Sequence, residues 1–516
     1  MSEKRFKRIY WEDRVVDDST GEVLVEGTPV NEENLNRIEE GIDEALDLGY
    51  DLKDRVEHLE STRVKRYGVR FYGSNPVGER VEDAVGMVAN VAVDDEIVVN
   101  DFDNVPFFNR RICCGHFDEE GNFHVHAYRG EPGFAWDGSA GEVMYEETPF
   151  YWKGDLHTYV SVCGSPLEGY QLAPRFRDGH TKEYSPVFWS ATVEGKATSR
   201  AGLFGEYQSL NDHMAVMQAT HSRAHTETMA SLFTDWLLLL VEFATKDLQT
   251  VMMGATSMAY GDSYKAKFSE PNVNRIIIEN DLADRFVIGQ TIGIGSSYIS
   301  DSVAKDRIVT SIVPHDEFHK AIYFDGEPVN ITEGNVVSSR TWRNGVTNII
   351  KASSGSIVSN TDDRYPCIWR GKVDPWGGAN SAICDVLVQR SGEDPDYVYT
   401  PYYLPDPTKY AAGAITPDYV PLNYGMAGSS GYVTELGRDD RFPHVMLPVA
   451  VGGSSTTYFS DYYWYPANPD SNGVTAVFAG GYWASAVGIG PFALYGTDAP
   501  SISTVIRRAR LFVSRA

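Results

Sequence analysis

Cysteine is scarce in this sequence. The 516 residues include five cysteines: Cys113, Cys114, Cys163, Cys367 and Cys384. An odd and low count over this length does not fit the disulfide framework that holds small secreted domains together. We therefore expect the fold to rest on hydrophobic cores, and we interpret the adjacent Cys113 and Cys114 as buried small side chains instead of a redox pair.

Positive charge is also in deficit. The chain has 45 Lys and Arg against 72 Asp and Glu, which gives a net charge of −27. The negative electrostatic field of such a chain repels phosphate backbones, so we expect no nucleic-acid partner. A small basic cluster closes the chain, and we expect it to pair with an acidic surface or a neighbouring subunit, nucleic acid being the weaker alternative. It consists of Arg507, Arg508, Arg510 and Arg515.

Long apolar runs are missing. The longest, near Trp236–Val241, is too short to span a bilayer. The basic start, Met1–Arg8, has no apolar segment behind it, so we expect no signal peptide. The sequence therefore predicts a soluble chain that is made in the cytoplasm and does not insert into a membrane.

Motifs of catalysis are absent as well. There is no P-loop and no Gly-x-Ser-x-Gly elbow. His221 and His225 are four residues apart, as are His315 and His319, so each pair could offer two imidazoles to a metal from one helix. Histidines at this spacing are more often structural or solvent-facing. We therefore predict that the protein is not an enzyme and uses neither a cofactor nor a metal.

A heptad pattern predicts a long helix over residues 33–61. Asn31 is placed to cap it, and Glu32 and Glu33 suit its first turn. The pattern favours a self-associating coiled coil, although an amphipathic helix packed on its own domain would look alike. Gly49 predicts a kink or a split into two helices. The positions expected to mediate oligomerisation are Leu35, Ile38, Ile42, Leu52, Val56 and Leu59.

Apolar residues alternate with polar ones over residues 66–192, which predicts a β-rich region. Helical spacing returns over residues 207–254. Within it, Ser231–Met253 is apolar on most sides, which predicts a buried helix that ends at Gly254. Short strands and long loops come after this helix. A chain of this length and pattern predicts an α+β fold with roughly two to four domains.

Two C-terminal stretches combine glycine with aromatic residues: Tyr458–Trp464 and Gly480–Phe492. Glycine gives backbone freedom, and the aromatic rings bring large apolar area. The combination favours a rigid platform of short strands and tight loops. A core hairpin of a β-rich domain is the alternative that composition leaves open.

The first half contains the stretches Thr28–Ile42, Tyr67–Pro76, Asp83–Gly86, Asn100–Asp103 and Asp137–Met144. Together they resemble tail proteins of phages and prophages of Gram-positive bacteria. The first stretch is similar to the N-terminal segment that is common in tail and baseplate proteins, and the others are similar to the region next to that segment in such proteins.

The second half contains the stretches Ser199–Leu203, Glu242–Gln249, Trp369–Gly377, Leu447–Ser455 and Gly480–Phe492, followed by Arg510 and Leu511. Together they resemble the C-type-lectin-like fold of phage receptor-binding proteins, including the variable proteins of diversity-generating retroelements. The formylglycine-generating enzymes share that fold, but they need reactive cysteines toward its C-terminal part, and no cysteine follows Cys384 here.

The resemblance implies which residues contact a ligand, because in that family the segment after the Gly-Gly-x-Trp turn displays the contacting side chains. This chain departs from the family at Ala486, where Gly is frequent, and at Arg507 and Arg508. The implied ligand-binding residues are Tyr482, Trp483, Ala484, Ala486, Val487, Ile489, Ala493, Tyr495, Thr497 and Asp498.

The resemblance further implies an organisation and a function. The chain would comprise a tail-attachment segment (1–32), the coiled coil (33–61), the β-rich region (66–192) and a C-type-lectin-like ligand-binding domain (193–516). It would form a homotrimer in the virion tail, contact other tail or baseplate proteins, and bind a glycan or protein receptor on the host surface. A structural baseplate component and a glycan-cleaving tail enzyme are the alternatives.

Overall fold

The structure is a computed structural model that describes residues 14–27, 31–90, 100–177, 179–345, 358–359 and 363–515. The chain forms two compact units, Met1–Lys65 and Arg66–Ala516. Across the described ranges no helix is both long and apolar enough to cross a membrane. Half of the predicted tail-attachment segment (1–32), namely residues 1–13 and 28–30, lies outside the described residues.

The first unit consists of a short hairpin and one long helix. Strands β1 (Val15–Val16) and β2 (Val23–Val25) pair antiparallel, and α1 comes next over Glu32–Thr62. Asn31 caps α1, since its side-chain oxygen accepts the backbone N–H of Asn34 at 2.9 Å. The helix runs through Gly49 without interruption, so the predicted split is wrong. A single glycine costs a helix only about 1 kcal/mol, which the flanking turns can bear.

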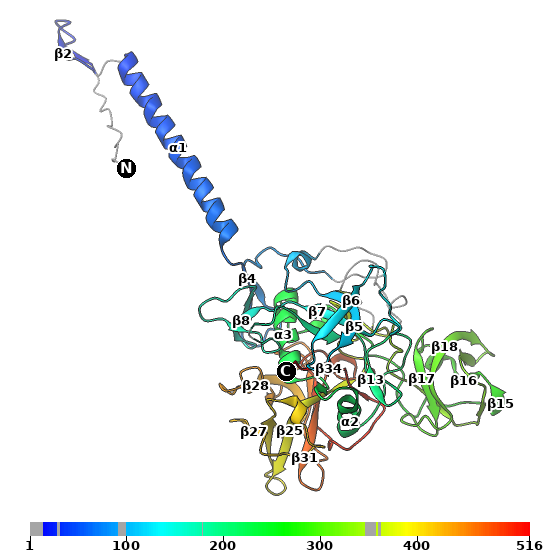
Figure 1. The fold of residues 1–516 in the computed structure, drawn as a ribbon. Helices are drawn as coiled ribbons and strands as arrows, with labels where there is room; N and C mark the ends of the chain where they lie inside the picture. The colour runs from blue at the N-terminus through cyan, green and yellow to red at the C-terminus, as the bar shows by residue number, and fades with distance from the viewer. Residues whose placement is uncertain are drawn as a thin grey trace. The chain divides into compact units, whose positions relative to one another are not determined.

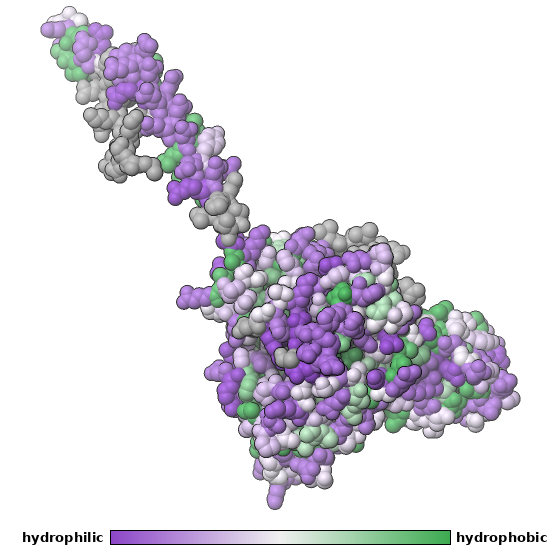
Figure 2. All heavy atoms as spheres, viewed as in Figure 1, coloured by the Kyte–Doolittle hydropathy of each residue, from purple (hydrophilic) through white to green (hydrophobic). Residues whose placement is uncertain are grey.

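The heptad side chains of α1, the long helix in Figure 1, are mostly exposed within this unit. Leu35, Ile42, Leu52 and Val56 are between 47 and 54 % exposed, and Ile38 is half-buried. The side chain of Leu59 lies outside the described residues. Figure 2 shows hydrophobic side chains between hydrophilic ones along the helix. The apolar stripe therefore lacks a partner within the hairpin and helix that make up the described part of this unit.

The second unit begins with two antiparallel sheets, so the β-rich character of residues 66–192 is as predicted. The five-stranded sheet has the order β10-β8-β9-β3-β4 and the four-stranded sheet the order β11-β7-β5-β6. The bounds are β3 Arg66–Arg70, β4 Glu79–Glu82, β5 Arg111–Phe117, β6 Phe123–Tyr128, β7 Glu142–Glu147, β8 Tyr151–Asp155, β9 Tyr159–Cys163, β10 Gln171–Leu172 and β11 Glu183–Pro186, with the hairpin β12 Ala191–Val193 and β13 Lys196–Thr198 after them.

Two capped helices come next. Ser209 caps α2 (Leu210–Thr220) and Thr228 caps α3 (Met229–Phe243), each by accepting a first-turn backbone N–H. Helix α3 is buried on nearly every side, as its apolar sequence predicts. It ends well before the predicted Gly254, because Ala244 adopts the left-handed conformation (φ 52°) and its carbonyl accepts the N–H of Gly78 at 2.8 Å.

One hydrophobic core joins the segments that the sequence assigned to separate domains. It contains Val69 of β3, Trp236 of α3 and Val433 of the C-terminal sheet. The predicted boundary between residues 192 and 193 is therefore not a boundary between cores. The alternating strands of the β-rich region need a cover for their apolar face, and the buried helix α3 supplies it.

Residues 255–342 form an inserted β lobe with a hydrophobic core of its own, which the sequence patterns did not predict. Its main sheet has the order β16-β19-β18-β17-β21. The elements are β15 Glu270–Val273, β16 Arg275–Glu279, α4 Asn280–Ala283, β17 Thr291–Gly295, β18 Ala304–Pro314, β19 His319–Phe324, β20 Val329–Ile331 and β21 Val336–Ser339.

The C-terminal half is organised around a nine-stranded sheet of order β27-β26-β25-β31-β32-β30-β28-β29, with β33 pairing parallel to β25. Its bounds are β25 Asn380–Ser391, β26 Val398–Tyr403, β27 Val420–Pro421, β28 Gly431–Leu436, β29 Pro448–Val451, β30 Tyr462–Trp464, β31 Val474–Ala479, β32 Leu494–Tyr495 and β33 Arg507–Arg508. Smaller pairings involve β14 Ala224–His225 with β34 Phe512–Val513, and β22 Val358–Ser359, β23 Ile368–Trp369 and β24 Lys372–Val373.

Three of the four arginines near the C-terminus lie in the interior, which corrects the prediction that they pair with an acidic surface or a neighbouring subunit. The fourth, Arg515, is half-buried and pairs with Glu183 at 3.7 Å. Arg507, Arg508 and Arg510 are at most 1 % exposed. Arg510 donates to the carbonyl oxygens of Val187, Val373 and Asp374, and its guanidinium lies 3.9 Å from the ring centroid of Trp189. Backbone carbonyls can satisfy a guanidinium because its donors are spread over a planar fork. Arg510 therefore ties β-rich and C-terminal segments together.

Candidate ligand-binding surface

Three adjacent strands of the C-terminal sheet carry aromatic side chains on one face. In β30, Tyr463 is fully buried, whereas Tyr462 and Trp464 are half-exposed. Side chains alternate between the faces of a strand, so Tyr462 and Trp464 share the face opposite to the core. In the register of the sheet, Tyr432 of β28 lies opposite Tyr462, and Tyr495 of β32 lies opposite Trp464.

These side chains form a continuous series, which we call the aromatic row: Tyr432, Tyr462, Trp464 and Tyr495. The ring centroids of neighbouring members are 5.2, 4.8 and 5.2 Å apart. Tilted and edge-to-face pairs at such distances stabilise one another. Each ring is half-buried, so the row is held in place and still faces solvent.

The polar ends of the row remain available. Among the hydrogen bonds of the described residues, none uses the hydroxyl of Tyr432, Tyr462 or Tyr495. The nearby carboxylate of Asp498 is engaged, because it pairs with Arg507 and accepts from Asn468 at 3.2 Å. The row therefore offers half-exposed aromatic surface and free hydroxyls, with the adjacent charge neutralised.

The loop with the predicted ligand contacts borders this row. Gly488 is so close to Tyr462 that a β-carbon added to it would lie 3.3 Å from the β-carbon of Tyr462. Tyr482 and Ala484 are half-buried, and Ala486 is exposed in η5 (Ala486–Gly488). The structure thus brings Tyr482, Ala484, Ala486 and Tyr495 to one region of the surface. Thr497 and Asp498 are half-buried beyond β32.

Other predicted contact residues point inward. Trp483, Ile489 and Ala493 are at most 1 % exposed, so they cannot touch a ligand from this conformation, and their predicted role is corrected. Packing against the inserted lobe explains why Trp483 is buried. The centroids of the Trp483 and Tyr260 rings are 5.8 Å apart, and Trp483 shares a hydrophobic cluster with Trp342. The side chain of Val487 lies outside the described residues.

A polar cavity of about 170 Å³ lies at the start of α3. Burial raises the pKa of Asp385 in its wall to about 7, and burial lowers the pKa of His225 and of His444 to about 4. Both imidazoles are therefore neutral near pH 7. The fold engages each of these groups: Asp385 accepts the N–H of Met229 at 3.0 Å, and His444 contacts the hydroxyl of Tyr403 at 3.0 Å. The cavity has room for a small polar molecule, but it presents no activated nucleophile.

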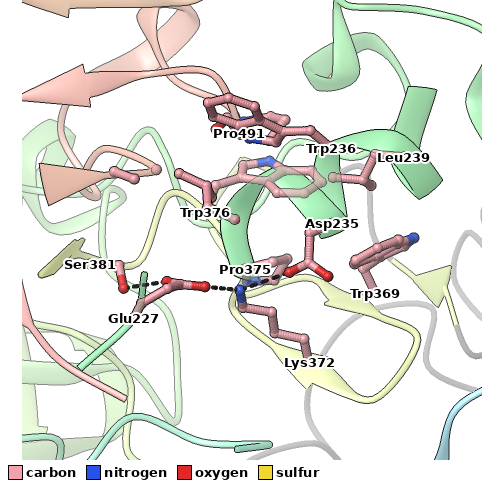
Figure 3. A pocket seen from close by; sticks show the side chains of 13 residues that line it. Glu227, Asp235, Trp236, Leu239, Trp369, Lys372, Pro375, Trp376, Ser381 and Pro491 are labelled. Carbon is pink, nitrogen blue, oxygen red and sulfur yellow. Dashed lines mark hydrogen bonds and ion pairs between the residues drawn. The ribbon is translucent and has the colours of Figure 1, made fainter. Parts of the chain in front are cut away.

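A second, smaller cavity of about 10 Å³ lies beside α3 and holds at most one water (Figure 3). Lys372 points into it between two carboxylates, with Nζ 2.6 Å from Glu227 and 3.0 Å from Asp235. Burial opposes the charge of Lys372, but the two carboxylates outweigh burial and raise its pKa. Arg110 extends the network to Asp235 at 2.5 Å and to Glu147 at 2.8 Å. Every charge is paired, which indicates a structural network.

The histidine pairs do not share helices, so the premise of a metal site fails. Helix α2 ends at Thr220, and His221 and His225 lie in the segment after it, bonded to Asp118 and Thr226 carbonyls respectively. His315 and His319 flank the turn between β18 and β19. No cluster of metal-binding side chains occurs in the parts of the chain that the structure describes.

No protein-family model matches the chain, and no curated protein matches it at a significant level. The resemblance to tail proteins therefore rests on the quoted stretches. The aromatic row was only half visible in the sequence. Tyr462 and Trp464 alternate around Tyr463, but Tyr432 becomes their neighbour only through the pairing of β28 with β30.

Proposed function

We propose that the chain is a phage tail fibre or receptor-binding protein that attaches the virion to the host cell surface. In this proposal the first unit associates copies into a homotrimer and contacts other tail or baseplate proteins. The second unit binds the receptor through a C-type-lectin-like C-terminal region. The protein would be made in the host cytoplasm and reside in the virion tail.

The observation that carries the proposal is the exposed heptad stripe of α1. Leu35, Ile42, Leu52 and Val56 are each about half exposed to water. Burying such a side chain fully is worth roughly 1.5–3 kcal/mol, so several copies of α1 gain substantially by packing together. Coiled-coil association of this kind is a common way to build a fibre.

The C-terminal surface supports the receptor role. Its aromatic row is held by a sheet whose other face belongs to the main core, so binding freezes few side chains. Rigid aromatic rings give contact area at low entropic cost. Association of three copies then multiplies a modest single-site affinity, because the second and third contacts become intramolecular.

The proposal is tested by binding of the full chain to cells of candidate hosts, with and without an intact helix stripe. The test variant carries Ile42→Asp and Leu52→Asp; the matched control carries Glu40→Ala and Asp47→Ala on the opposite face of the helix. We expect the test variant to be monomeric by light scattering and to bind cells about 100-fold more weakly, whereas the control matches the wild type.

Two outcomes would contradict the proposal. A wild-type chain that is monomeric would remove the role of the stripe. A wild-type oligomer that binds no candidate host would favour a structural baseplate component whose surface other tail proteins cover.

A further inference from the structure

We propose that the ligand of the aromatic row is a neutral carbohydrate polymer. This inference rests on the proposed receptor-binding function and specifies the chemical class of the receptor. It is carried by the composition of the row, by what its surroundings lack and by the charge of the chain.

The row suits the shape of a sugar chain. Tyr432, Tyr462, Trp464 and Tyr495 follow one another with centroids 4.8 to 5.2 Å apart, which is comparable to the size of one sugar ring. The C–H face of a sugar packs on an aromatic face, and the partly positive hydrogens meet the negative π surface. The planes of neighbouring members are inclined by 83°, 53° and 37°. One sugar ring can therefore pack on one member of the row, while the tilted neighbours offer ring edges and hydroxyls to the sugars beside it.

The hydroxyls of the row complement this stacking. Those of Tyr432, Tyr462 and Tyr495 make no hydrogen bond within the described part of the protein. A phenol hydroxyl both donates and accepts, so it can pair with a sugar hydroxyl in either role. Because the rings are already fixed by one another, little conformational freedom is lost on binding.

A protein partner fits this surface less well. Protein interfaces also use Tyr and Trp, but they set them in a desolvated apolar core surrounded by a polar rim. None of the exposed large hydrophobic residues lies on β28, β30 or β32. Several occur instead on the inserted lobe, where Ile288, Ile299 and Phe318 are 53 to 66 % exposed.

A strongly anionic polymer fits less well too. The chain carries a net charge of −27, which repels polyphosphates such as teichoic acids. Arg507, the cation beside Asp498, is buried and already paired with that carboxylate. These charges leave an uncharged polymer as the ligand.

The experiment measures binding of the full chain to four materials from one host: intact cells, periodate-oxidised cells, the neutral-polysaccharide fraction and the teichoic-acid fraction. Periodate cleaves vicinal diols and so destroys most sugar rings without breaking protein backbones. The variants are Trp464→Ala, the conservative Trp464→Phe, and the control Phe318→Ala on the inserted lobe. An unchanged melting temperature shows that each variant is folded.

We expect the wild type to bind untreated cells and the neutral fraction, with affinity that salt changes little, and to lose binding to oxidised cells. Trp464→Ala should weaken binding about tenfold or more, whereas Trp464→Phe should retain most of it and Phe318→Ala all of it. If the wild type bound oxidised and untreated cells equally, and Trp464→Ala still bound both more weakly, the ligand would be a protein and not a carbohydrate. The proposed receptor function would stand. Salt-sensitive binding to the teichoic-acid fraction alone would show that the ligand is an anionic polymer and not a neutral one. Absence of binding to any host cell would overturn the inference together with the proposed function.

Discussion

Replacing Lys372 by Met tests how far the second unit depends on its buried charges. The Nζ atom of Lys372 lies 2.6 Å from Glu227 and 3.0 Å from Asp235, and the three side chains are between 2 and 8 % exposed. Glu227 also accepts from Ser381 at 2.6 Å. These residues come from β24, the segment before α3, and α3 itself, so the network joins parts that are distant in the sequence.

The variant leaves Glu227 buried without its cation, whereas Asp235 keeps Arg110. Removing one partner of a buried ion pair costs about 3–5 kcal/mol, because the remaining charge is desolvated and uncompensated. The Lys372→Met protein should lose about that much free energy of unfolding at pH 7. Adding Glu227→Gln should restore part of it, since the orphaned charge is then gone.

The loss of unfolding free energy in Lys372→Met should also depend on pH. In the wild type, burial acts to raise the pKa of Glu227, but Lys372, Arg510 and the hydrogen bond from Ser381 together outweigh burial and lower it. A lowered pKa gives stability that is present above the unfolded pKa of Glu and is lost as pH falls through the folded value. Without Lys372, only Arg510 and Ser381 still oppose burial. The pKa of Glu227 then rises relative to the wild type, so the variant loses stability above the unfolded pKa and regains it below. The difference between the two proteins should shrink as pH falls from about 7 toward the usual pKa of Glu, near 4.3.

Urea unfolding followed by tryptophan fluorescence measures this, at fixed protein concentration because association shifts the apparent stability. The matched control is Lys409→Met, which removes an exposed pair with Asp418 at 2.7 Å and should leave the unfolding curve unchanged. A loss below about 1 kcal/mol for Lys372→Met, or a loss that grows toward acid pH, would refute the account of the network.

Two further predictions concern the walls of the candidate sites. Burial raises the pKa of Asp385 from 3.8 to about 7. The stabilising contribution of this carboxyl is therefore complete below pH 3.8 and is lost as pH rises through about 7. The side chain of Asp385→Asn stays neutral, so the variant should show a flatter pH dependence of urea unfolding, and its stability relative to the wild type should rise by on the order of a few kcal/mol from pH 5 to pH 8. A steeper dependence in the variant would contradict this. Gly481 has φ +68°, and a β-carbon there would lie 2.1 Å from Cγ2 of Ile489, so Gly481→Ala should lower the free energy of unfolding by roughly 1–3 kcal/mol. Gly428→Ala, where the nearest side-chain atom is 3.4 Å away, should be tolerated, and equal losses in the two variants would contradict the steric argument.

Local patterns in the sequence predicted the elements that depend on neighbours in the chain. The cap at Asn31, the heptads of α1 and the alternation in β3 and β6 each depend on residues within one or two turns or strands. The end of α3 could not be predicted in this way. It depends on the left-handed conformation of Ala244 and on its hydrogen bond with Gly78, which lies far earlier in the sequence. Helix propensity carries no information about such a contact.

Contacts between residues distant in the sequence also determine which charged and aromatic side chains are buried. Arg510 looks like a surface residue by composition, yet three backbone carbonyls and the ring of Trp189 hold it in the core. Trp483 was predicted by resemblance to be an exposed platform residue, yet the inserted lobe packs against it. Neither partner lies near its residue in the sequence, so no local pattern could reveal the burial.

The burial of Trp483 has a consequence for where a ligand can bind. With Trp483, Ile489 and Ala493 in the interior, the Gly480–Phe492 segment serves mainly as a support, and its surface contribution shrinks to Tyr482, Ala484 and Ala486. The open aromatic area then lies on the adjacent strands, where Trp464 and Tyr495 are paired across β30 and β32. A loop that varies its small residues at the edge of a fixed row would change which ligands fit without disturbing the core that holds the rings. Binding strength would then depend on the row, and selectivity on the loop beside it.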